Sequence, residues 1–270
     1  MKTITSRDNP TLKSLRALLT DTRKQRASGQ AVLEGPHLLA AALDHQVRPD
    51  LIVVCEGACT NPEVTGLLAR AGKVETLCLP DPLFRSLSEL AAPVGILARI
   101  AVPINAAVPA GAVPPAPTFM PDGDCLLLDA VQDAGNVGTL LRTAAAAGVR
   151  DVLLGPGCAG AWSPRVLRAA QGAHFGLCIR EQADLAGFLK HYSGNPVATV
   201  ARDGASLYAL DLRQPVAWLF GNEGAGLAPE LVALAKRRST IPLAAGSESL
   251  NVAAAAAVCL FEMRRQREFR

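Results

Sequence analysis

Short apolar runs alternate with helix-like patterns along the first hundred residues. The runs at 31–33, 51–54, 74–79 and 94–100 suit strands, and the patterns at 11–19, 37–43 and 63–71 suit helices. Apolar positions that recur every second residue fit a strand, whereas recurrence every third or fourth residue fits a helix. Regular alternation of the two predicts an α/β sandwich of modest size in this part of the chain.

The second half of the chain repeats the alternation with more continuous apolar runs. Predicted strands cover 125–129, 152–154, 197–200 and 216–220, and predicted helices cover 137–147, 164–171, 185–191, 229–236 and 250–267. Nearly unbroken apolar strands are typical of a parallel sheet that is buried on both faces. We therefore expect a doubly wound α/β domain, in which ligands bind beyond the carboxyl ends of the strands.

A proline-rich segment separates the two halves. Six prolines stand among small and apolar residues with almost no charge, namely Pro103, Pro109, Pro114, Pro115, Pro117 and Pro121. Proline removes backbone donors and opposes helix formation, so this composition predicts a semi-extended connector. The expected organisation is a domain over 1–101, a linker over 102–122 and a second domain over 123–270.

Composition narrows the classes of protein that remain. The chain has 270 residues, half of them hydrophobic, which is enough for a substantial core. No apolar stretch approaches the roughly 18 to 20 residues that a membrane span needs, and the basic start lacks a signal-peptide core. Seven cysteines at irregular positions and four scattered histidines favour reduced thiols over disulfides or zinc sites. We expect a soluble cytoplasmic protein with no membrane partner and no metal.

The formal net charge of +3 is too small to indicate a nucleic-acid partner, but the basic residues are clustered. One cluster lies near the N-terminus and consists of Arg7, Lys13, Arg16, Arg23, Lys24 and Arg26, and another consists of Arg264, Arg265, Arg267 and Arg270. Such clusters can neutralise phosphates. A solvated helix face is the alternative.

The first strand-to-helix junction of the second half contains a candidate substrate residue. The strand that ends at Asp129 leads to Asn136, a favoured N-cap, and the helix ends before Gly148. Arg142 then stands on the helix rather than in the loop. An arginine among small residues needs a carboxylate or a phosphate partner, so a structural ion pair and a substrate contact both stay open.

The second junction is rich in glycine. Gly221, Gly224 and Gly226 permit positive φ angles and a close approach of the backbone to a ligand. Their spacing is Gly-x-x-Gly-x-Gly and comes late in the domain, so it does not match a dinucleotide-binding fingerprint. A plain tight turn would explain the glycines but not the neighbouring Asn222 and Glu223.

The third junction places polar residues at the start of a long alanine-rich helix. Ser247 or Ser249 is expected to cap this helix. Asn251 is expected within the first turn, where capping does not account for it, and its side chain is free to face a ligand.

Together the three junctions closely resemble the signature motifs of the SpoU (TrmH-type) RNA ribose 2′-O-methyltransferases, within the SPOUT superfamily. The motifs read QDAGNVGTLLRTA from residue 132, FGNEGAGL from residue 220, and IPL at 241–243 followed by SESLNVA from residue 247. The resemblance covers about 4–262, and VLEGP at 32–36 resembles the family's N-terminal substrate-binding module. It implies S-adenosylmethionine as cofactor, a deep trefoil knot, and a homodimer whose two subunits form the active site together.

The resemblance also assigns roles to individual residues. Asn136 would organise the site, Arg142 would contact the RNA, and Glu223 would match the acidic residue of the second motif. The implied catalytic set is Asn136, Arg142, Glu223, Ser249 and Asn251, and the implied cofactor-binding set is Gly221, Asn222, Glu223, Gly224, Ile241, Leu243, Ser249, Leu250 and Asn251. Two positions depart from the family pattern, Ala134 in place of proline and Ala253 in place of serine, and neither removes a reacting side chain.

A methyl group on a sulfonium is already activated, so its transfer needs alignment and removal of the hydroxyl proton, without a metal. Arginine is a poor base because its pKa lies above about 12. Two roles for Arg142 therefore stay open. The resemblance implies that it activates the ribose hydroxyl, and the alternative is that it holds phosphate and stabilises the alkoxide while Glu223 or water takes the proton. Ribosomal RNA is the favoured substrate over transfer RNA. The alternatives are a catalytically silent RNA-binding protein on the same scaffold and a nucleotide-dependent oxidoreductase, which the glycine spacing disfavours.

Overall fold

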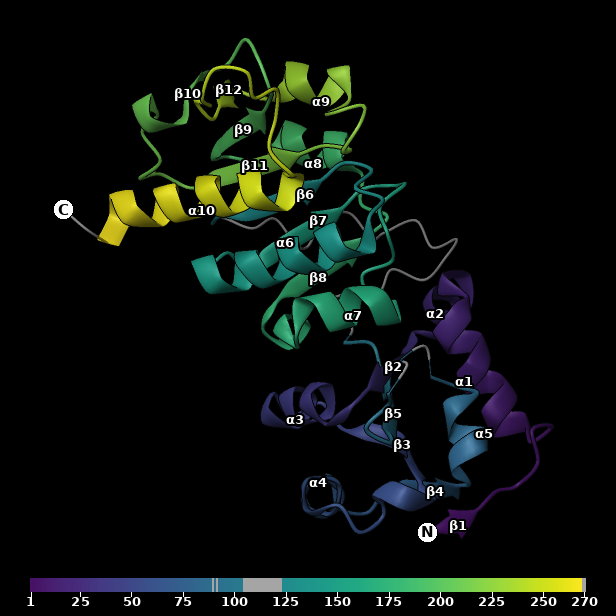
Figure 1. The fold of residues 1–270 in the computed structure, drawn as a ribbon. Coiled ribbons are helices and arrows are strands. Elements are labelled where there is room, and N and C mark those ends of the chain that lie inside the picture. The colour runs from purple at the N-terminus through teal and green to yellow at the C-terminus, as the bar shows by residue number, and fades with distance from the viewer. Residues whose placement is uncertain (89, 91, 104–122, 269–270) are drawn as a thin grey trace.

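The computed structural model describes residues 1–88, 90, 92–103 and 123–268. Two separate sheets organise this part of the chain, one from β1 to β5 and one from β6 to β12 (Figure 1). The proline-rich linker expected over 102–122 lies almost entirely outside the described residues.

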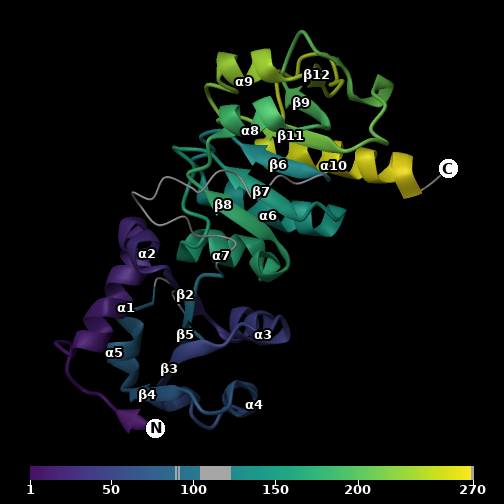
Figure 2. The same ribbon diagram turned by 180° about the vertical axis from the view of Figure 1, so that it is seen from behind.

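The N-terminal sheet is mixed and covered by helices on both faces (Figures 1 and 2). Its strands, in spatial order, are β1 (Lys2–Thr3), β4 (Glu75–Leu79), β3 (Pro49–Cys55), β5 (Ile96–Ala101) and β2 (Gln30–Glu34). Its helices are α1 (Pro10–Thr20), α2 (Thr22–Ser28), α3 (Pro36–Asp44), α4 (Pro62–Ala71) and α5 (Asp81–Arg85). Alternate residues of β3 enter different cores: Leu51 and Val53 pack in the layer with α1 and α5, and Ile52 and Val54 in the layer with α3 and α4. The predicted sandwich is confirmed.

The C-terminal sheet is parallel in all its strand pairs within the described residues. Its order is β10 (Ala205–Ser206), β12 (Arg237–Thr240), β9 (Asn195–Thr199), β11 (Val216–Phe220), β6 (Cys125–Leu128), β7 (Asp151–Leu154) and β8 (Cys178–Glu181). Helices α6 (Ala134–Ala147), α7 (Pro164–Ala170) and α10 (Val252–Glu268) cover one face, and α8 (Leu185–His191) and α9 (Pro229–Leu234) the other (Figure 1). The doubly wound arrangement expected from the apolar runs is therefore present.

Elements without an apolar run were missed by the sequence pattern. Strand β12 reads Arg-Arg-Ser-Thr and β8 reads Cys-Ile-Arg-Glu, and each buries only one of its four residues. Both lie at or next to an edge of the sheet, where solvent reaches the side chains. Helix α2 was missed as well, because its seven residues carry no apolar stripe.

Direct contacts join the two sheets. The carboxylate of Glu181 on β8 accepts from Arg26 Nη2 of α2 at 2.9 Å and from the Ala161 backbone N–H at 3.0 Å. Gln25 Nε2 donates to the Trp162 carbonyl at 3.3 Å. One apolar core cluster continues from Leu33 and Leu38 in the N-terminal half to Trp162 and Leu167 in the C-terminal half. The orientation of the two halves is thus fixed by packing and hydrogen bonds.

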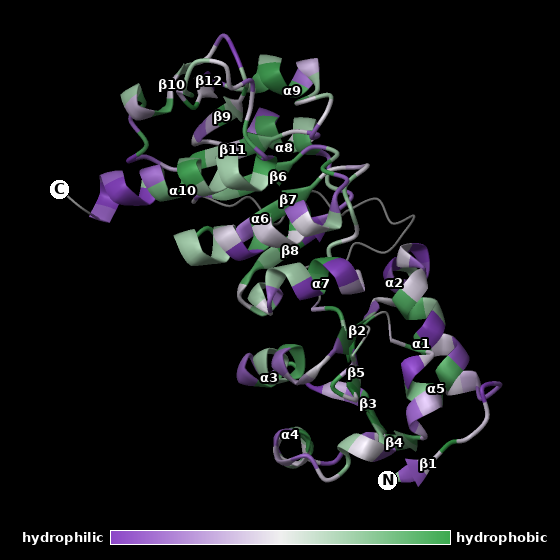
Figure 3. Cartoon of the chain, viewed as in Figure 1, coloured by the Kyte–Doolittle hydropathy of each residue, from purple (hydrophilic) through white to green (hydrophobic). Residues whose placement is uncertain are grey.

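Figure 3 shows that the hydrophobic residues gather in the strands and in the helix faces that cover them. Within the ranges that the structure describes, no helix is long and apolar enough to cross a membrane.

Candidate functional site

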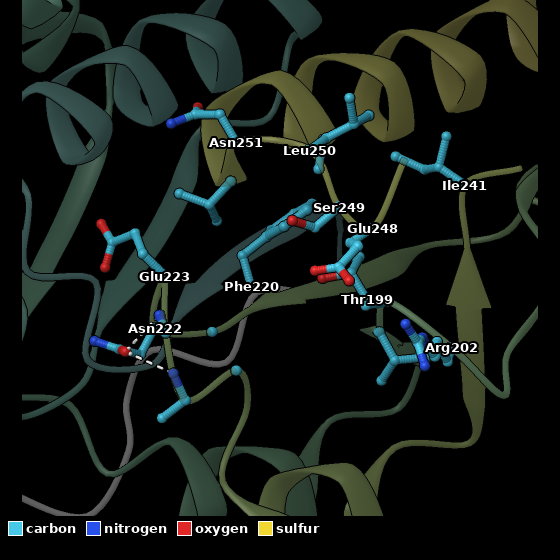
Figure 4. A pocket seen from close by; sticks show the side chains of 18 of the residues that line it. Thr199, Arg202, Phe220, Asn222, Glu223, Ile241, Glu248, Ser249, Leu250 and Asn251 are labelled. Carbon is cyan, nitrogen blue, oxygen red and sulfur yellow. Dashed lines mark hydrogen bonds between the residues drawn. The ribbon is translucent and has the colours of Figure 1, made fainter. Parts of the chain in front are cut away.

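A pocket of about 630 Å³ opens where β9, β11 and β12 end and α10 begins (Figure 4). We call it the loop pocket, because three loops form most of its wall. Its lining residues are Thr199, Val200, Ala201, Arg202, Phe220, Gly221, Asn222, Glu223, Gly224, Ala225, Gly226, Ser239, Ile241, Leu243, Glu248, Ser249, Leu250, Asn251, Val252 and Ala255. Every residue that the sequence nominated for cofactor binding lies in this wall.

The loop after β11 closes on itself, and glycine is required for that. Asn222 N donates to the Gly226 carbonyl at 3.0 Å, and Gly226 N donates back to the Asn222 carbonyl at 2.9 Å. A Cβ on Gly221 would lie 2.2 Å from the carbonyl carbon of Gly226, and Gly226 itself has a φ of 72°. The Asn222 side chain holds the turn from inside, since its Oδ1 accepts from the backbone N–H groups of Gly224 and Ala225, both at 2.9 Å.

Glu223 connects this loop to the start of α6. Its carboxylate accepts from Asn136 Nδ2 at 2.9 Å and from the backbone N–H groups of Asp133 and Gln132 at 3.2 and 3.3 Å. Partial burial pushes the pKa of Glu223 upward, but these hydrogen bonds, with Asn136 the strongest contributor, outweigh burial and hold the pKa below its ordinary value. Glu223 is therefore an ionised acceptor with its oxygens already engaged, which makes it a poor proton acceptor.

Asn251 completes the connection. Its Nδ2 donates to Asn136 Oδ1 at 2.9 Å, so Asn136 bridges Glu223 and Asn251. We call these three residues the Asn–Glu–Asn link. It joins the loop after β11, the N-terminus of α6 and the N-terminus of α10, which are far apart in the sequence.

Two expectations about helix caps were wrong. Helix α6 begins at Ala134, and its N-cap is Asp133, whose Oδ1 accepts from the Asn136 backbone N–H at 2.7 Å. Helix α10 begins at Val252, and Asn251 caps it by accepting from the N–H groups of Ala253 and Ala254 at 2.9 and 3.3 Å. The amide of asparagine carries both an acceptor and donors. The Asn251 amide thus accepts from two backbone N–H groups while it donates to Asn136, and the Asn136 amide donates to Glu223 while it accepts from Asn251.

Arg142 stands apart from the loop pocket. It lies on α6 six residues beyond Asn136, so it is about 9 Å further along the helix axis. It belongs to an exposed stripe made of Gly135, Thr139, Arg142 and Ala146. Among the described residues its guanidinium has no hydrogen-bond or ion-pair partner, so the structural ion pair that the sequence left open is absent there.

Other residues line the pocket that were not predicted from the sequence. Thr199 ends β9 and is followed by Val200, Ala201 and Arg202, and Arg202 lies at the opposite end of the pocket from Glu223 and Asn251 (Figure 4). The signal was available, because 197–200 was recognised as a parallel strand and ligands gather beyond the carboxyl ends of such strands. Ser239 was missed because β12 itself was missed.

The basic residues divide into engaged and unengaged ones. Arg26 pairs with Glu181, Lys13 Nζ lies 2.8 Å from Asp8, and Arg16 Nη2 donates to Ser86 Oγ at 3.4 Å. The remaining candidates of the N-terminal cluster are Arg7, Arg23 and Lys24, whose side chains have no partner in the described part of the chain.

Three of the four C-terminal arginines are paired within the fold, and Arg270 lies outside the described residues. Arg264 pairs with Glu268, Arg265 with Glu262, and Arg267 with Asp124.

All seven cysteines are free thiols in this structure. The described residues contain no group of three or more histidine, cysteine, aspartate or glutamate side chains that could hold a metal ion.

Comparison with known proteins adds family relationships to this geometry. Residues 125–261 match the model of the SpoU rRNA Methylase family, and residues 9–98 match that of the MRM3-like substrate binding domain. The 23S rRNA (guanosine(2553)-2′-O)-methyltransferase RlmP of Bacillus subtilis is 32% identical over 98% of this chain and 100% of its own length. A 23S rRNA (uridine(2479)-2′-O)-methyltransferase of Streptomyces viridochromogenes is 26% identical over 98% of this chain and 92% of its own.

A solved structure resembles the whole chain. The AdoMet-bound rRNA methyltransferase from Sinorhizobium meliloti superposes with a TM-score of 0.81 at 28% identity, covering 98% of this chain and 97% of that one. AdoMet is S-adenosylmethionine, and the superposition extends over both sheets described above.

Proposed function

Because the chain belongs to the SpoU rRNA methylase family, we propose that it transfers a methyl group from S-adenosylmethionine to a ribose 2′-hydroxyl of ribosomal RNA. The observation that carries this proposal is the Asn–Glu–Asn link, which joins the three motif segments around one pocket.

The residues of the loop pocket fit the cofactor. Gly221 keeps the loop after β11 in its closed turn, because a Cβ there would collide with the backbone of Gly226 and Leu227, and the polar groups of Glu223, Ser249 and Asn251 line the same wall. A volume of about 630 Å³ lies within the range of small-molecule sites. We assign Gly221, Ile241, Leu243 and Leu250 to the adenosyl portion, with Asn222, Gly224, Ser249 and Asn251 completing the wall.

Positioning is the proposed task of the Asn–Glu–Asn link. When bound, the cofactor supplies a methyl group that its sulfonium has already activated. Glu223 fixes the loop after β11 against α6, and Asn136 transmits that position to Asn251 and α10. Because Glu223 is held ionised with its oxygens occupied, we propose that water rather than Glu223 accepts the ribose proton.

Arg142 is the proposed substrate contact. Its guanidinium stays protonated and presents donors in a planar fork that matches a phosphate. It lies on an exposed helix face and has no partner among the described residues, so it is available to hold the RNA backbone and to stabilise the alkoxide that forms at the 2′-oxygen.

We propose that two copies of the chain form the working enzyme. In one chain Arg142 lies away from the loop pocket, so a second copy is needed to place an Arg142 at that pocket. The outer face of α10 supports this arrangement, because Phe261 is large and apolar and yet 47% exposed. Sedimentation of the purified protein tests the homodimer.

The proposed domain roles follow the two sheets. Residues 1–101 would bind RNA, the linker would span 102–122, and 123–270 would carry catalysis. The two relatives above are named for guanosine and for uridine, so membership of the family does not specify the base. We further propose that the C-terminal segment forms the trefoil knot of the family and that the protein acts in the cytoplasm, where ribosomes are assembled.

Calorimetry tests the cofactor, with S-adenosylmethionine and S-adenosylhomocysteine as ligands and NAD as the control. Binding of the first two but not of NAD is expected, and no heat with either adenosyl compound would overturn the proposal. Mapping of 2′-O-methylation in total RNA from cells with and without the gene then identifies the nucleotide. Loss of one methylated position in ribosomal RNA is the expected result, whereas loss in transfer RNA would reassign the substrate.

A further inference from the structure

The floor of the loop pocket contains a buried hydroxyl without a partner. Ser239 on β12 is 2% exposed, and its Oγ has no hydrogen-bond partner among the described residues. Of the residues that line the pocket, only Ser239 and Phe220 are almost completely shielded from solvent. They therefore form its deepest part.

Strand register places the Ser239 side chain on the same face of the sheet as that of Thr199. Ser239 pairs with Thr199 on β9, which is the strand next to β11 and Phe220. Paired residues of adjacent strands present their side chains on the same face of the sheet. Thr199 already uses its hydroxyl, which donates to the Leu219 carbonyl at 2.6 Å. Ser239 Oγ is left as the unsatisfied polar atom of this floor.

A buried polar atom without a partner is costly, and a ligand that enters the pocket can satisfy it. The charged and amide side chains of the pocket, among them Arg202, Glu223, Glu248 and Asn251, come from loops near solvent, whereas the floor offers an aromatic ring and one hydroxyl. The charged amino-acid end of S-adenosylmethionine is expensive to desolvate and belongs near the loops. A planar heteroaromatic base suits the floor.

We propose that Ser239 is a cofactor-binding residue that forms a hydrogen bond through Oγ with the adenine of S-adenosylmethionine. This inference rests on the proposed methyltransferase function. It assigns a base-reading contact to a strand that lies outside the three signature motifs.

The test compares Ser239→Ala with Thr240→Val, a matched control in which the next hydroxyl along the strand is removed. Thr240 Oγ1 accepts from the Gly204 backbone N–H and does not line the pocket. Ser239→Ala is expected to bind S-adenosylhomocysteine about three- to tenfold more weakly, the effect of one neutral hydrogen bond. Its unfolding temperature without ligand is expected to match or exceed that of the wild type, because a buried unsatisfied group has been removed. Thr240→Val should retain wild-type affinity.

Deaza analogues of S-adenosylhomocysteine, each lacking one ring nitrogen of adenine, locate the partner atom. One of them should bind the wild type and Ser239→Ala equally, because the contact is absent in both. If Ser239→Ala binds all ligands as the wild type does, the inference is wrong. If its penalty persists with every deaza analogue and disappears with a deoxyribose analogue, the contact is to ribose and the adenine assignment fails. Absence of any binding by the wild type would instead overturn the proposed function.

Discussion

Replacing Asn136 with aspartate tests the Asn–Glu–Asn link most directly. The substitution keeps an acceptor for Asn251 Nδ2, but it turns the donor that faces Glu223 into a second carboxylate. The two carboxylates would stand about as far apart as the present pair, in which 2.9 Å separates Asn136 Nδ2 from Glu223 Oε1. Like charges at that distance repel each other and raise the pKa of the pair.

The magnitude follows from Coulomb's law. Two unit charges ~3 Å apart repel by about 1.4 kcal/mol in water and about 5.5 kcal/mol at an effective dielectric constant of 20. Glu223 is exposed, so solvent screening favours the lower figure, about 1–2 kcal/mol. The lost hydrogen bond adds about 1 kcal/mol. A total of about 2–3 kcal/mol corresponds to an upper limit of about 30- to 150-fold in kcat/KM.

The assay is transfer of a labelled methyl group to RNA, measured between about pH 5 and pH 8. The activity of Asn136→Asp relative to wild type should rise as the pH falls, since a proton shared by the two carboxylates restores a hydrogen bond. Glu223→Gln should be impaired too. The double variant Asn136→Asp with Glu223→Gln should have a higher methyl-transfer activity than Asn136→Asp alone, because the glutamine amide can donate a hydrogen bond to the new aspartate. Wild-type activity in Asn136→Asp at neutral pH, or no recovery in the double variant, would refute this account of the link.

Three further predictions concern the substrate and the pH response. Arg142→Ala should abolish methyl transfer while cofactor affinity changes by no more than a few-fold, and Arg142→Lys should fail as well because an ammonium cannot make a bidentate contact; full activity of the lysine variant would contradict the assigned role. Joint replacement of Arg7, Arg23 and Lys24 with glutamine should weaken RNA binding. The slope of the logarithm of the binding constant against the logarithm of the salt concentration should become less negative by roughly 0.7–0.9 for each lost phosphate contact. An unchanged slope in filter binding would show that these residues do not contact phosphate. The pKa of Glu223 is lowered in the fold, so its contribution to the stability of the site should be complete above its ordinary value of 4.5 and decline as the pH falls below it; a melting series should show this decline in the wild type and not in Glu223→Gln.

The apolar patterns predicted the central strands of both sheets because burial determines those residues. Strand β11 is all apolar and was found with its correct bounds, 216–220. Strand β12 was not found, because Arg237, Arg238 and Thr240 are not buried and its place in the sheet depends on pairing with β9. Local sequence does not encode such long-range pairing.

The sequence predicted which residues belong to the candidate site but not the hydrogen bonds that join them. The motifs nominated Asn136, Glu223 and Asn251 separately. Their mutual hydrogen bonds depend on how α6 and α10 pack, with Trp218 Nε1 donating to Met263 Sδ beneath α10. Ser239 had no local signal beyond its place two residues before Ile241, since its burial arises only once β12 lies beside β9.

The contacts between the two sheets have a consequence for how a target is selected. Arg26, Glu181 and the shared apolar core hold the N-terminal half at a set distance and angle from the loop pocket. With the N-terminal half as the proposed RNA-binding part, this fixed geometry would set the distance between the bound RNA element and the methylated nucleotide. A nucleotide would be methylated because it lies at the right separation from the gripped element, and adding or removing one base pair between the two would move it out of reach.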